Sequence, residues 1–527
     1  MSKHTKYEAQ VEGNSYAAAQ AKFEEIVEQL RQEPAQTMRH DEIEGLVETA
    51  GRELLRRLVQ GHMDERSQRR ASEPVIDAQG QVHPHKRMNT RGLMTIFGEV
   101  SVKRQGHGGI GIEGLHPLDA ELNLPEELYS HTLSKRVAEA AAKESFEEVM
   151  TEITQHTGVE IPKRQVEELT ERAAQDFEAF YEQRNMGLSD GLSDTPKSKS
   201  TGDILVITVD GKGVPMLNRD LRAYTQAAAA RASPHLKHRA SKGEKPHRKR
   251  MATVAAVYTI EPWVRLPEQI MQELHPADVP TAEPVPRSPR PRPENKRVWA
   301  SLKHIPPEVI GQALSEAHQR DPAHAKHWTA LVDGNPTQIE ALQAEATQRG
   351  ITLTIILDLI HVLEYLWSAA WVLFDEADPN VEVWIHDHLD ALLHGRSSLM
   401  AAGLRRSATL RGLSAEQRKP IDRCADYLLN HRDYLHYDRY LSAGFPIATG
   451  VIEGACRHLV KDRMELTGAR WGMDSAESVL RLRALRSSGD FEPYWAFHLK
   501  QEFQRRHLSL YANDKIPQLF PVSIRVA

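Results

Sequence analysis

Cysteine is scarce in this chain, with Cys424 and Cys456 the only two among 527 residues. Two cysteines cannot build a disulfide framework or a cysteine-rich zinc site, and they suit a reducing cytosol. Long hydrophobic runs are also missing, because the best candidate, residues 351–363, contains Asp358 and His361 and falls short of the roughly 20 residues of a membrane span. Polar residues follow Met1, unlike a secretory signal. We therefore expect a cytoplasmic, nucleoid-associated protein with no membrane partner.

A strong positive net charge is absent as well, since the formal charge is −6. Local clusters rather than the total set a phosphate-binding field, however, and residues 231–250 hold eight lysines and arginines against one glutamate. This basic loop predicts contact with DNA, and a solvated loop is the plainer alternative. The expected DNA-binding residues in it are Lys237, Arg239, Lys242, Lys245, Arg248, Lys249 and Arg250.

The N-terminal part of the chain predicts helices around a small β segment. Residues 1–85 have helical periodicity and many acids, which indicates an arm for packing or oligomerisation. Residues 86–130 alternate as a strand pair with a turn at Gly98, followed by a glycine-rich loop. Residues 131–184 predict three helices, and polar residues 185–202 predict a linker.

The second and third of these helices have the layout of a helix-turn-helix. Ser145 and Glu148 form a capping box at the start of the second helix, and Gly158 ends it. Lys163 and Arg164 would then lead a recognition helix that contacts DNA. An ordinary helical hairpin explains the same pattern equally well.

The catalytic part is expected to begin at residue 203, and the fold class is multidomain α/β plus α. The strand-like segments ILVITVD, MATVAAVYTI, KRVWASLKH, WTALVD and ITLTIILD alternate with helices in the order βββαβαβ, completed by a late helix. This order predicts a ribonuclease-H-like core with a mixed sheet, in which the first and fourth strands are parallel neighbours. Residues 203–361 form its first part, 362–445 an all-α insertion, 446–490 its final catalytic helix and 491–527 a C-terminal tail.

Three acids are the candidate catalytic and metal-binding residues. Asp210 and Asp333 each follow an apolar strand and precede a glycine, while Glu453 lies in a basic helix. Three hard oxygen ligands favour two Mg²⁺ or Mn²⁺ ions per site, as in enzymes that cut phosphodiesters. Asp358 competes with Asp333 but follows an edge strand, one strand further from Asp210. His361, one helical turn on, could position a phosphate, although a helix-capping Asp358 with a satisfied His361 is the alternative.

Basic residues surround the third acid. Arg457 and Lys461 are one helical turn apart on the face predicted for Glu453. Basic groups beside a metal-binding acid favour contact with a DNA backbone, and a salt-bridged surface helix is the alternative. Trp471 would either stack on an unpaired base or belong to the core. The remaining expected DNA contacts are Arg463 and Arg470.

From about residue 91 to 495 the chain resembles the DDE transposases of bacterial insertion sequences, especially the Kra-type group allied to Mutator-like transposases. The resemblance rests on RGLMTIFGEVSVKR, PLDAELNLP, VITVDGKGVPM, KRMATVAAVY, ALVDGNPTQIEAL, ILDLIHVLEYLW and GVIEGACRHLVKDRMELTGARW, in this order. It implies Asp210, Asp333 and Glu453 as the catalytic triad. DLIH looks like the Asp/Cys-x-x-His signature that follows the second acid, which favours Asp333 over Asp358.

The resemblance also implies a function and partners. Relatives cleave transposon ends and transfer the strand into target DNA, so double-stranded DNA and a homodimer or larger assembly are the expected partners. One departure is clear: the stretch QGHGGIGIEGLH lacks the cysteine pair that relatives often use for a zinc ribbon. The alternatives are a regulatory DNA-binding protein with a degenerate nuclease-like domain, or a metal-dependent nuclease without strand transfer.

Overall fold

The computed structural model describes residues 14–186, 201–231, 248–274, 289–375, 377–448, 450–466 and 468–521. It divides into two units: Met1–Phe180 together with Glu492–Ala527, and Tyr181–Phe491. Within the described ranges, no helix combines the length and hydropathy that crossing a membrane would require. Most of the predicted linker, and Lys237, Arg239, Lys242 and Lys245 of the basic loop, lie outside the described residues.

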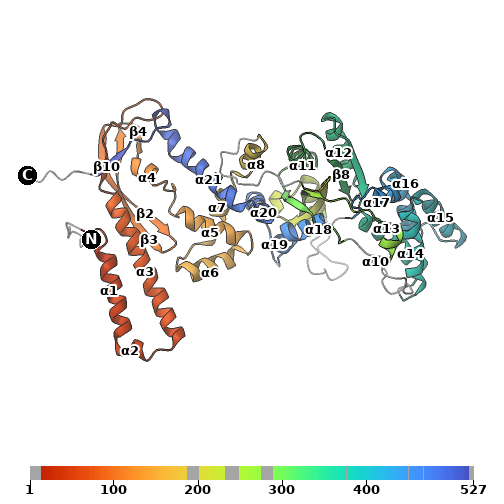
Figure 1. Cartoon of the computed structure of the whole chain (residues 1–527), viewed down its shortest axis with the longest axis horizontal. Coiled ribbons are helices and arrows are strands. Elements are labelled where there is room, and N and C mark those ends of the chain that lie inside the picture. The colour runs from red at the N-terminus through yellow and green to blue at the C-terminus, as the bar shows by residue number, and fades with distance from the viewer. Residues whose placement is uncertain are drawn as a thin grey trace, which may run out of the picture. The chain divides into compact units, whose positions relative to one another are not determined.

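A long helical pair opens the first unit (Figure 1, red). Helix α1 (Ala17–Arg31) packs along α3 (His40–Arg66), with the short α2 (Glu33–Gln36) between them, so the prediction of helices in this stretch is confirmed up to Arg66. The predicted hairpin is confirmed too, as β2 (His85–Thr95) and β3 (Gly98–Gly109) turn at Gly98, whose φ is +116°. Part of the glycine-rich stretch, expected to be a loop, instead forms β4 (Ile112–Leu115) against β3.

Three predicted helices follow as α5 (His131–Ala141), α6 (Phe146–Thr157) and α7 (Lys163–Ala173). Ser145 and Glu148 form the expected capping box of α6, and Gly158 ends that helix with a left-handed φ of +69°. Residues 491–527 were expected to be a tail, but they include the 16-residue helix α21 (Phe491–Arg506). The other elements here are α4 (Pro117–Glu121), α8 (Phe177–Asn185), β1 (Arg69–Ala71) and β10 (Leu519–Pro521).

A five-stranded mixed sheet forms the centre of the second unit, with strand order β7-β6-β5-β8-β9. β5, β8 and β9 are parallel, whereas β6 is antiparallel to both β5 and β7. The predicted order of strands is confirmed, as is the parallel pairing of the first strand with the fourth. The strands are β5 (Ile204–Pro215), β6 (Lys249–Ile260), β7 (Glu294–Ser301), β8 (His327–Val332) and β9 (Leu353–Leu357).

Helices lie in the connections between the strands, and α11 and α12 pack on the sheet. Residues 204–209 of β5 are all buried, as expected for a central strand covered on both faces. α11 packs on β5 and β6, and α12 packs on α11. The connecting helices are α9 (Ala223–Arg231), α10 (Pro267–Leu274), α11 (Pro306–Arg320) and α12 (Pro336–Gln348).

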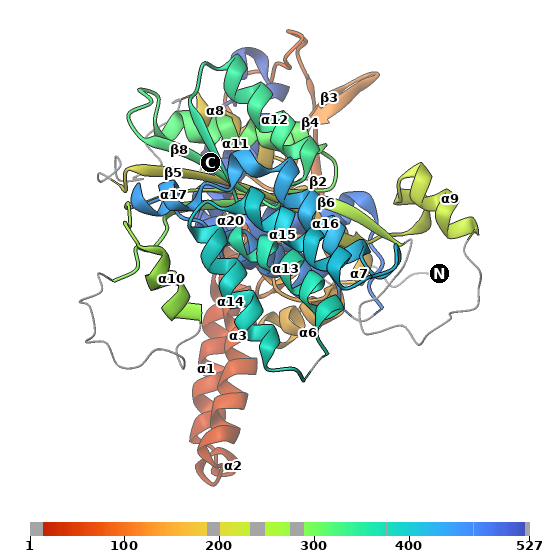
Figure 2. The same cartoon turned by 90° about the vertical axis from the view of Figure 1, so that its right-hand side faces the viewer.

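The segment predicted to be an all-α insertion is helical, and it shares a core with the sheet. Figure 2 shows its helices gathered into one bundle, and contacts join α13 to α14 and α16, and α15 to α14 and α16. Ile204, Leu331 and Ile356 of the sheet belong to the same apolar cluster as Leu366 and Leu428 of the bundle. The helices are α13 (Leu359–Leu373), α14 (Asn380–Leu393), α15 (Ser397–Leu410), α16 (Lys419–Asn430) and α17 (Tyr437–Ser442).

The chain then returns to the sheet through a helical segment that carries Glu453. α18 (Gly450–Ala455) packs on β5 and β6, and it continues as η3 (Cys456–Lys461), which is π-helical, and α19 (Asp462–Met464). α20 (Met473–Ser488) packs against β7.

Candidate active site

Asp210 and Asp333 lie at the same level of two neighbouring parallel strands. β5 and β8 pair from Ile204 with His327 to Thr208 with Leu331, a constant offset of 123 residues. The same offset, 333 − 210 = 123, places Asp333 beside Asp210 two positions further on. Neighbouring strands are about 4.8 Å apart and equivalent positions share a face. The expectation that Asp210 ends its strand was wrong, since β5 continues through it to Pro215.

Asp358 continues this row on the third parallel strand. β8 and β9 pair up to Val332 with Leu357, and the amide of Asp358 donates to the carbonyl of Val332 over 2.9 Å. Asp358 therefore lies beside Asp333, and one strand further from Asp210, as expected.

The side chain of Asp358 is used in the fold. It is 3% exposed and caps α13, accepting a hydrogen bond from the amide of Ile360 over 2.9 Å. His361, the next polar residue, lies 3.4 Å from Glu364 within the same helix. These contacts are those of a capping aspartate and a locally paired histidine, the alternative left open for the DLIH segment.

Glu453 is carried by the helical segment that packs against Asp210. Glu453 itself is exposed, whereas Cys456, one turn later, is buried. The Cys456 thiol donates to Oδ2 of Asp210 over 3.2 Å. Burial is the main reason that the pKa of Cys456 lies far above its ordinary value, and the nearby carboxylates of Asp210 and Glu453 raise it further. The thiol thus stays protonated and joins the third acid's helix to the first acid.

The second acid is fixed by the helical insertion. The Tyr427 hydroxyl in α16 donates to the backbone carbonyl of Asp333 over 2.8 Å, and its ring stacks on Tyr365 with centroids 4.0 Å apart. Gly334 adopts φ +91°, and a Cβ there would lie 2.9 Å from the Tyr427 ring. The glycine after Asp333 is therefore required by the backbone and by Tyr427. Sequence reasoning missed both Tyr427 and Cys456, because no local pattern marks a contact across such separations.

The carboxylate oxygens suit a hard divalent cation. Oδ1 of Asp210 accepts from the amide of Gly211 over 2.6 Å, and Oδ1 of Asp333 accepts from the amide of Asn335 over 2.9 Å. Carboxylate oxygens have further lone pairs, so both groups retain capacity for a metal. Among the described residues, ligand atoms of Asp210, Asp333 and Glu453 do not all lie within 4.8 Å of one another. Two ions, each shared by two acids, would not require that spacing.

The residues after Glu453 do not follow regular α-helical geometry. The turn of η3 is π-helical, with a wider period than an α-helix, and Glu453, Arg457 and Lys461 are all exposed, so their shared face stays a prediction. Arg457 lies 3.6 Å from Asp462. Arg470 is also exposed. These three cations remain candidates for a phosphate backbone.

Arg463 and Trp471 form a buried pair. They are 3% and 6% exposed, with the Arg463 guanidinium 4.7 Å from the Trp471 ring centroid. The Trp471 amide donates to the carbonyl of Pro215 over 3.0 Å, and its indole donates to the carbonyl of Met464 over 3.0 Å. Of the two readings of Trp471, this geometry is that of a core tryptophan. Neither side chain is placed to reach DNA in this structure.

The other described cations differ in exposure. Lys163 and Arg164 lie on the surface at the start of α7, where they pair with Glu147 and Glu168. Arg248 is exposed. Lys249 pairs with Glu465 over 2.7 Å, and Arg250 donates to the carbonyls of Leu302 and Asp220, so these two are partly committed to the fold.

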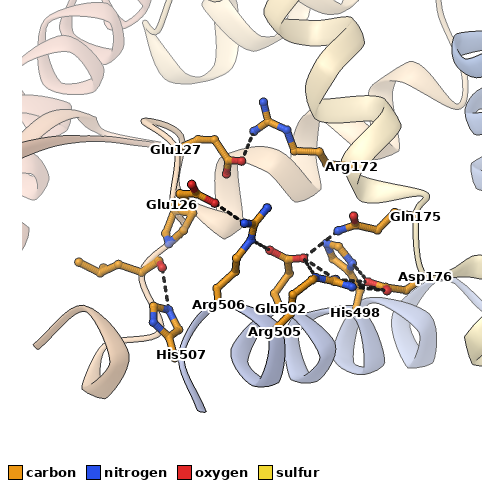
Figure 3. A network of polar contacts seen from close by, with 12 residues as sticks. Glu126, Glu127, Arg172, Gln175, Asp176, His498, Glu502, Arg505, Arg506 and His507 are labelled. Atoms are coloured by element: carbon orange, nitrogen blue, oxygen red, sulfur yellow. Dashed lines mark hydrogen bonds and ion pairs between the residues drawn. The ribbon is translucent and has the colours of Figure 1, made fainter. Parts of the chain in front are cut away.

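A separate group with metal-ligand spacing lies in the first unit (Figure 3). Ligand atoms of Asp176, His498 and Glu502 lie within 4.8 Å of one another. Nδ1 of His498 is 2.7 Å from Asp176, and the Arg505 guanidinium bridges Asp176 at 3.0 Å and Glu502 at 2.5 Å. Arg505 supplies the positive charge that a cation would bring, so we interpret the group as an ion-pair network.

Comparison with known proteins adds little to this geometry. No family model and no curated protein matches the sequence. Among solved structures, the Drosophila P element transposase strand transfer complex matches with a TM-score of 0.20 and 9% identity, covering 74% of this chain and 83% of that chain. A TM-score this low does not establish a shared fold.

Proposed function

We propose that this protein is a metal-dependent DNA transposase that uses Asp210, Asp333 and Glu453 to cut transposon ends and join them to target DNA. The observation that carries the proposal is the parallel register of β5 and β8, which, extended by two positions beyond Thr208 and Leu331, places Asp333 beside Asp210. The Cys456 bond to Asp210 supports the third position, because it holds the helix of Glu453 against the same strand.

In this proposal each acid has a distinct structural support. Asp210 is held by a central strand, Asp333 by the Tyr427 bond to its backbone, and Glu453 by a helix whose next turn is anchored at Cys456. Together they would hold two Mg²⁺ or Mn²⁺ ions, which supply activation of the attacking oxygen and stabilisation of the departing one. Arg457, Lys461 and Arg470 would hold the DNA backbone beside the acids.

We also propose a fold for the catalytic core and roles for the N-terminal helices. The strand order and the late helix support a ribonuclease-H-like core at 203–361 and 446–490, with the bundle at 362–445 as an insertion. In the first unit, α6 and α7 would form a helix-turn-helix that presents Lys163 and Arg164 to the transposon ends. The arm at 1–85 would serve oligomerisation, since transposition must bring two ends together.

A cleavage assay tests the proposal. The substrate is a duplex containing the DNA that flanks the gene, incubated with the full-length protein and Mg²⁺ or Mn²⁺. Asp210→Asn, Asp333→Asn and Glu453→Gln should each abolish cleavage and strand joining while leaving DNA binding largely intact. Full activity of Asp333→Asn would refute the assignment, and cleavage without joined products would identify a nuclease instead.

A further inference from the structure

A groove with basic walls runs along helix α18 in the second unit. It encloses about 960 Å³, within the range of ligand-binding clefts. Its lining includes residues at the start of β7 and residues of α18 and the start of η3. The groove is therefore built on the helix that carries Glu453, although Glu453 does not line it.

The charge of the groove is strongly positive. Arg290, Arg292 and Lys296 line it, are exposed, and form no ion pair with any other residue that the structure describes. Glu261 is the single acid in the lining. Cations that line one groove repel one another, so an anionic occupant would relieve that repulsion.

An aromatic ring lines the same groove. Trp263 is partly exposed, and its amide donates to the carbonyl of Gly444 over 2.9 Å. The Arg265 guanidinium lies 4.7 Å from the Trp263 ring centroid and donates to the carbonyls of Trp263 and Phe445, which fixes the ring in place. A basic wall beside a fixed aromatic ring is the combination that binds unpaired nucleotides.

Two glycines of α18 line the groove and leave it without side chains at their positions. They are Gly450 and Gly454, and a Cβ added at either would meet no atom within 4 Å. Cys456, on the same segment, is instead bonded to Asp210. The segment therefore contacts Asp210 through Cys456 and, at Gly450 and Gly454, leaves room for a DNA backbone to approach.

We propose that this groove binds an unpaired DNA strand, with its phosphates on Arg290, Arg292 and Lys296 and a base against Trp263. The inference rests on the proposed function in that it names a second DNA contact of the same enzyme, separate from the strand held at Asp210, Asp333 and Glu453. A strand in the groove would lie along the helix that carries Glu453, so its binding would hold that helix in position.

The salt dependence of DNA binding tests the charged wall. The full-length protein and the variant Arg290→Gln/Arg292→Gln/Lys296→Gln are titrated with a fluorescein-labelled single strand at several salt concentrations. Each lost phosphate contact should lower the slope of log affinity against log salt by about 0.7, or roughly 2 for three contacts. The matched control neutralises exposed Arg406, Arg423 and Arg439 of the helical bundle. A slope equal to that of wild type in the groove variant would overturn the proposal.

A blocking variant tests the groove without removing charge. Gly454→Leu should fill the open space and weaken binding of the single strand about tenfold, whereas Gly403→Leu, at an exposed helical glycine of α15 that also has open space, should not. Unchanged binding by a folded Gly454→Leu protein would contradict the proposal. Because both readouts are binding, a wild-type protein that fails to cleave but loses affinity in these variants would refute the proposed function and leave the groove standing.

Discussion

The Cys456 thiol donates a hydrogen bond to Oδ2 of Asp210 over 3.2 Å, although the two residues are 246 positions apart. This contact ties the helix of Glu453 to the central strand of the sheet. It assigns Cys456 a positioning role, because the thiol acts on Asp210 and has no direct part in the chemistry.

Removing the Cys456 thiol should weaken the positioning of Asp210 without unfolding the protein. Cys456→Ala should lower the rate of cleavage about 3- to 10-fold, which corresponds to one hydrogen bond of about 1 kcal/mol. Cys456→Ser keeps a donor at the same position and should stay within about 3-fold of wild type. Single-turnover cleavage and DNA affinity should be measured together. Equal losses in the two variants, or a loss of DNA affinity alone, would argue against positioning through Asp210.

Gly334 should tolerate no side chain, because two separate costs meet there. Gly334→Ala places a Cβ 2.9 Å from the Tyr427 ring at a φ of +91°. We therefore expect the free energy of unfolding to fall by about 3 kcal/mol. Gly350→Ala is the matched control, since its φ of +65° carries strain but nothing lies within 4 Å of the new Cβ. It should cost about 1 kcal/mol. Similar denaturant unfolding curves for both variants would show that Tyr427 does not restrict the Asp333 turn.

The Asp176 network should make the first unit sensitive to acid. Burial raises the pKa of Asp176, but hydrogen bonds from His498 and Arg505 outweigh it and hold the pKa below its ordinary value. A lowered carboxyl pKa stabilises the fold above the unfolded-state pKa of about 4, and this stabilisation is lost as pH falls through the folded-state pKa. The stability difference between wild type and Asp176→Asn should therefore be full at neutral pH and shrink below about pH 4.

Denaturant unfolding at several pH values measures this difference. Glu160→Gln, at an exposed acid of the same unit, serves as the control and should show little effect at any pH. A stability difference for Asp176→Asn that stays constant from neutral pH to pH 3 would contradict the account of the network.

The basic loop, largely outside the described residues, should add to DNA affinity. Changing Lys237, Arg239, Lys242 and Lys245 to glutamine should weaken binding to duplex DNA and lower the salt slope by up to about 4. Anisotropy titrations over a range of salt measure both quantities. An unchanged slope would favour the alternative of a solvated loop.

Much of the second unit could be predicted from local pattern. The apolar runs that end in VDG mark β5 and β8, and the crossover rule makes these strands parallel neighbours, so Asp333 could be chosen over Asp358 before any coordinates. The helices of the bundle and the Ser145 capping box could also be predicted, because helical periodicity and capping residues are local features of the sequence.

Packing between residues far apart in the sequence could not be predicted from local pattern. Arg463 looked like a DNA contact in a basic helix, yet it is buried on Trp471, because the strand end at Pro215 binds the backbone of that tryptophan. The π-helical turn after Glu453 was not predicted either, because no residue propensity marks such a turn in a sequence. The helix at Phe491–Arg506 buries Tyr494 and His498 through contacts with Ala173 and Asp176, which lie more than 300 positions earlier, so its own sequence did not distinguish it from a tail.

Metal binding tests the central claim most directly. Mn²⁺ should be titrated into the full-length protein with its DNA, and the free ion followed by electron paramagnetic resonance. Asp210→Asn and Asp333→Asn should each lose bound Mn²⁺, whereas Asp358→Asn, which keeps the cap of α13, should bind as wild type does. Wild-type Mn²⁺ binding by Asp333→Asn together with loss in Asp358→Asn would contradict the account and install Asp358 as the second acid.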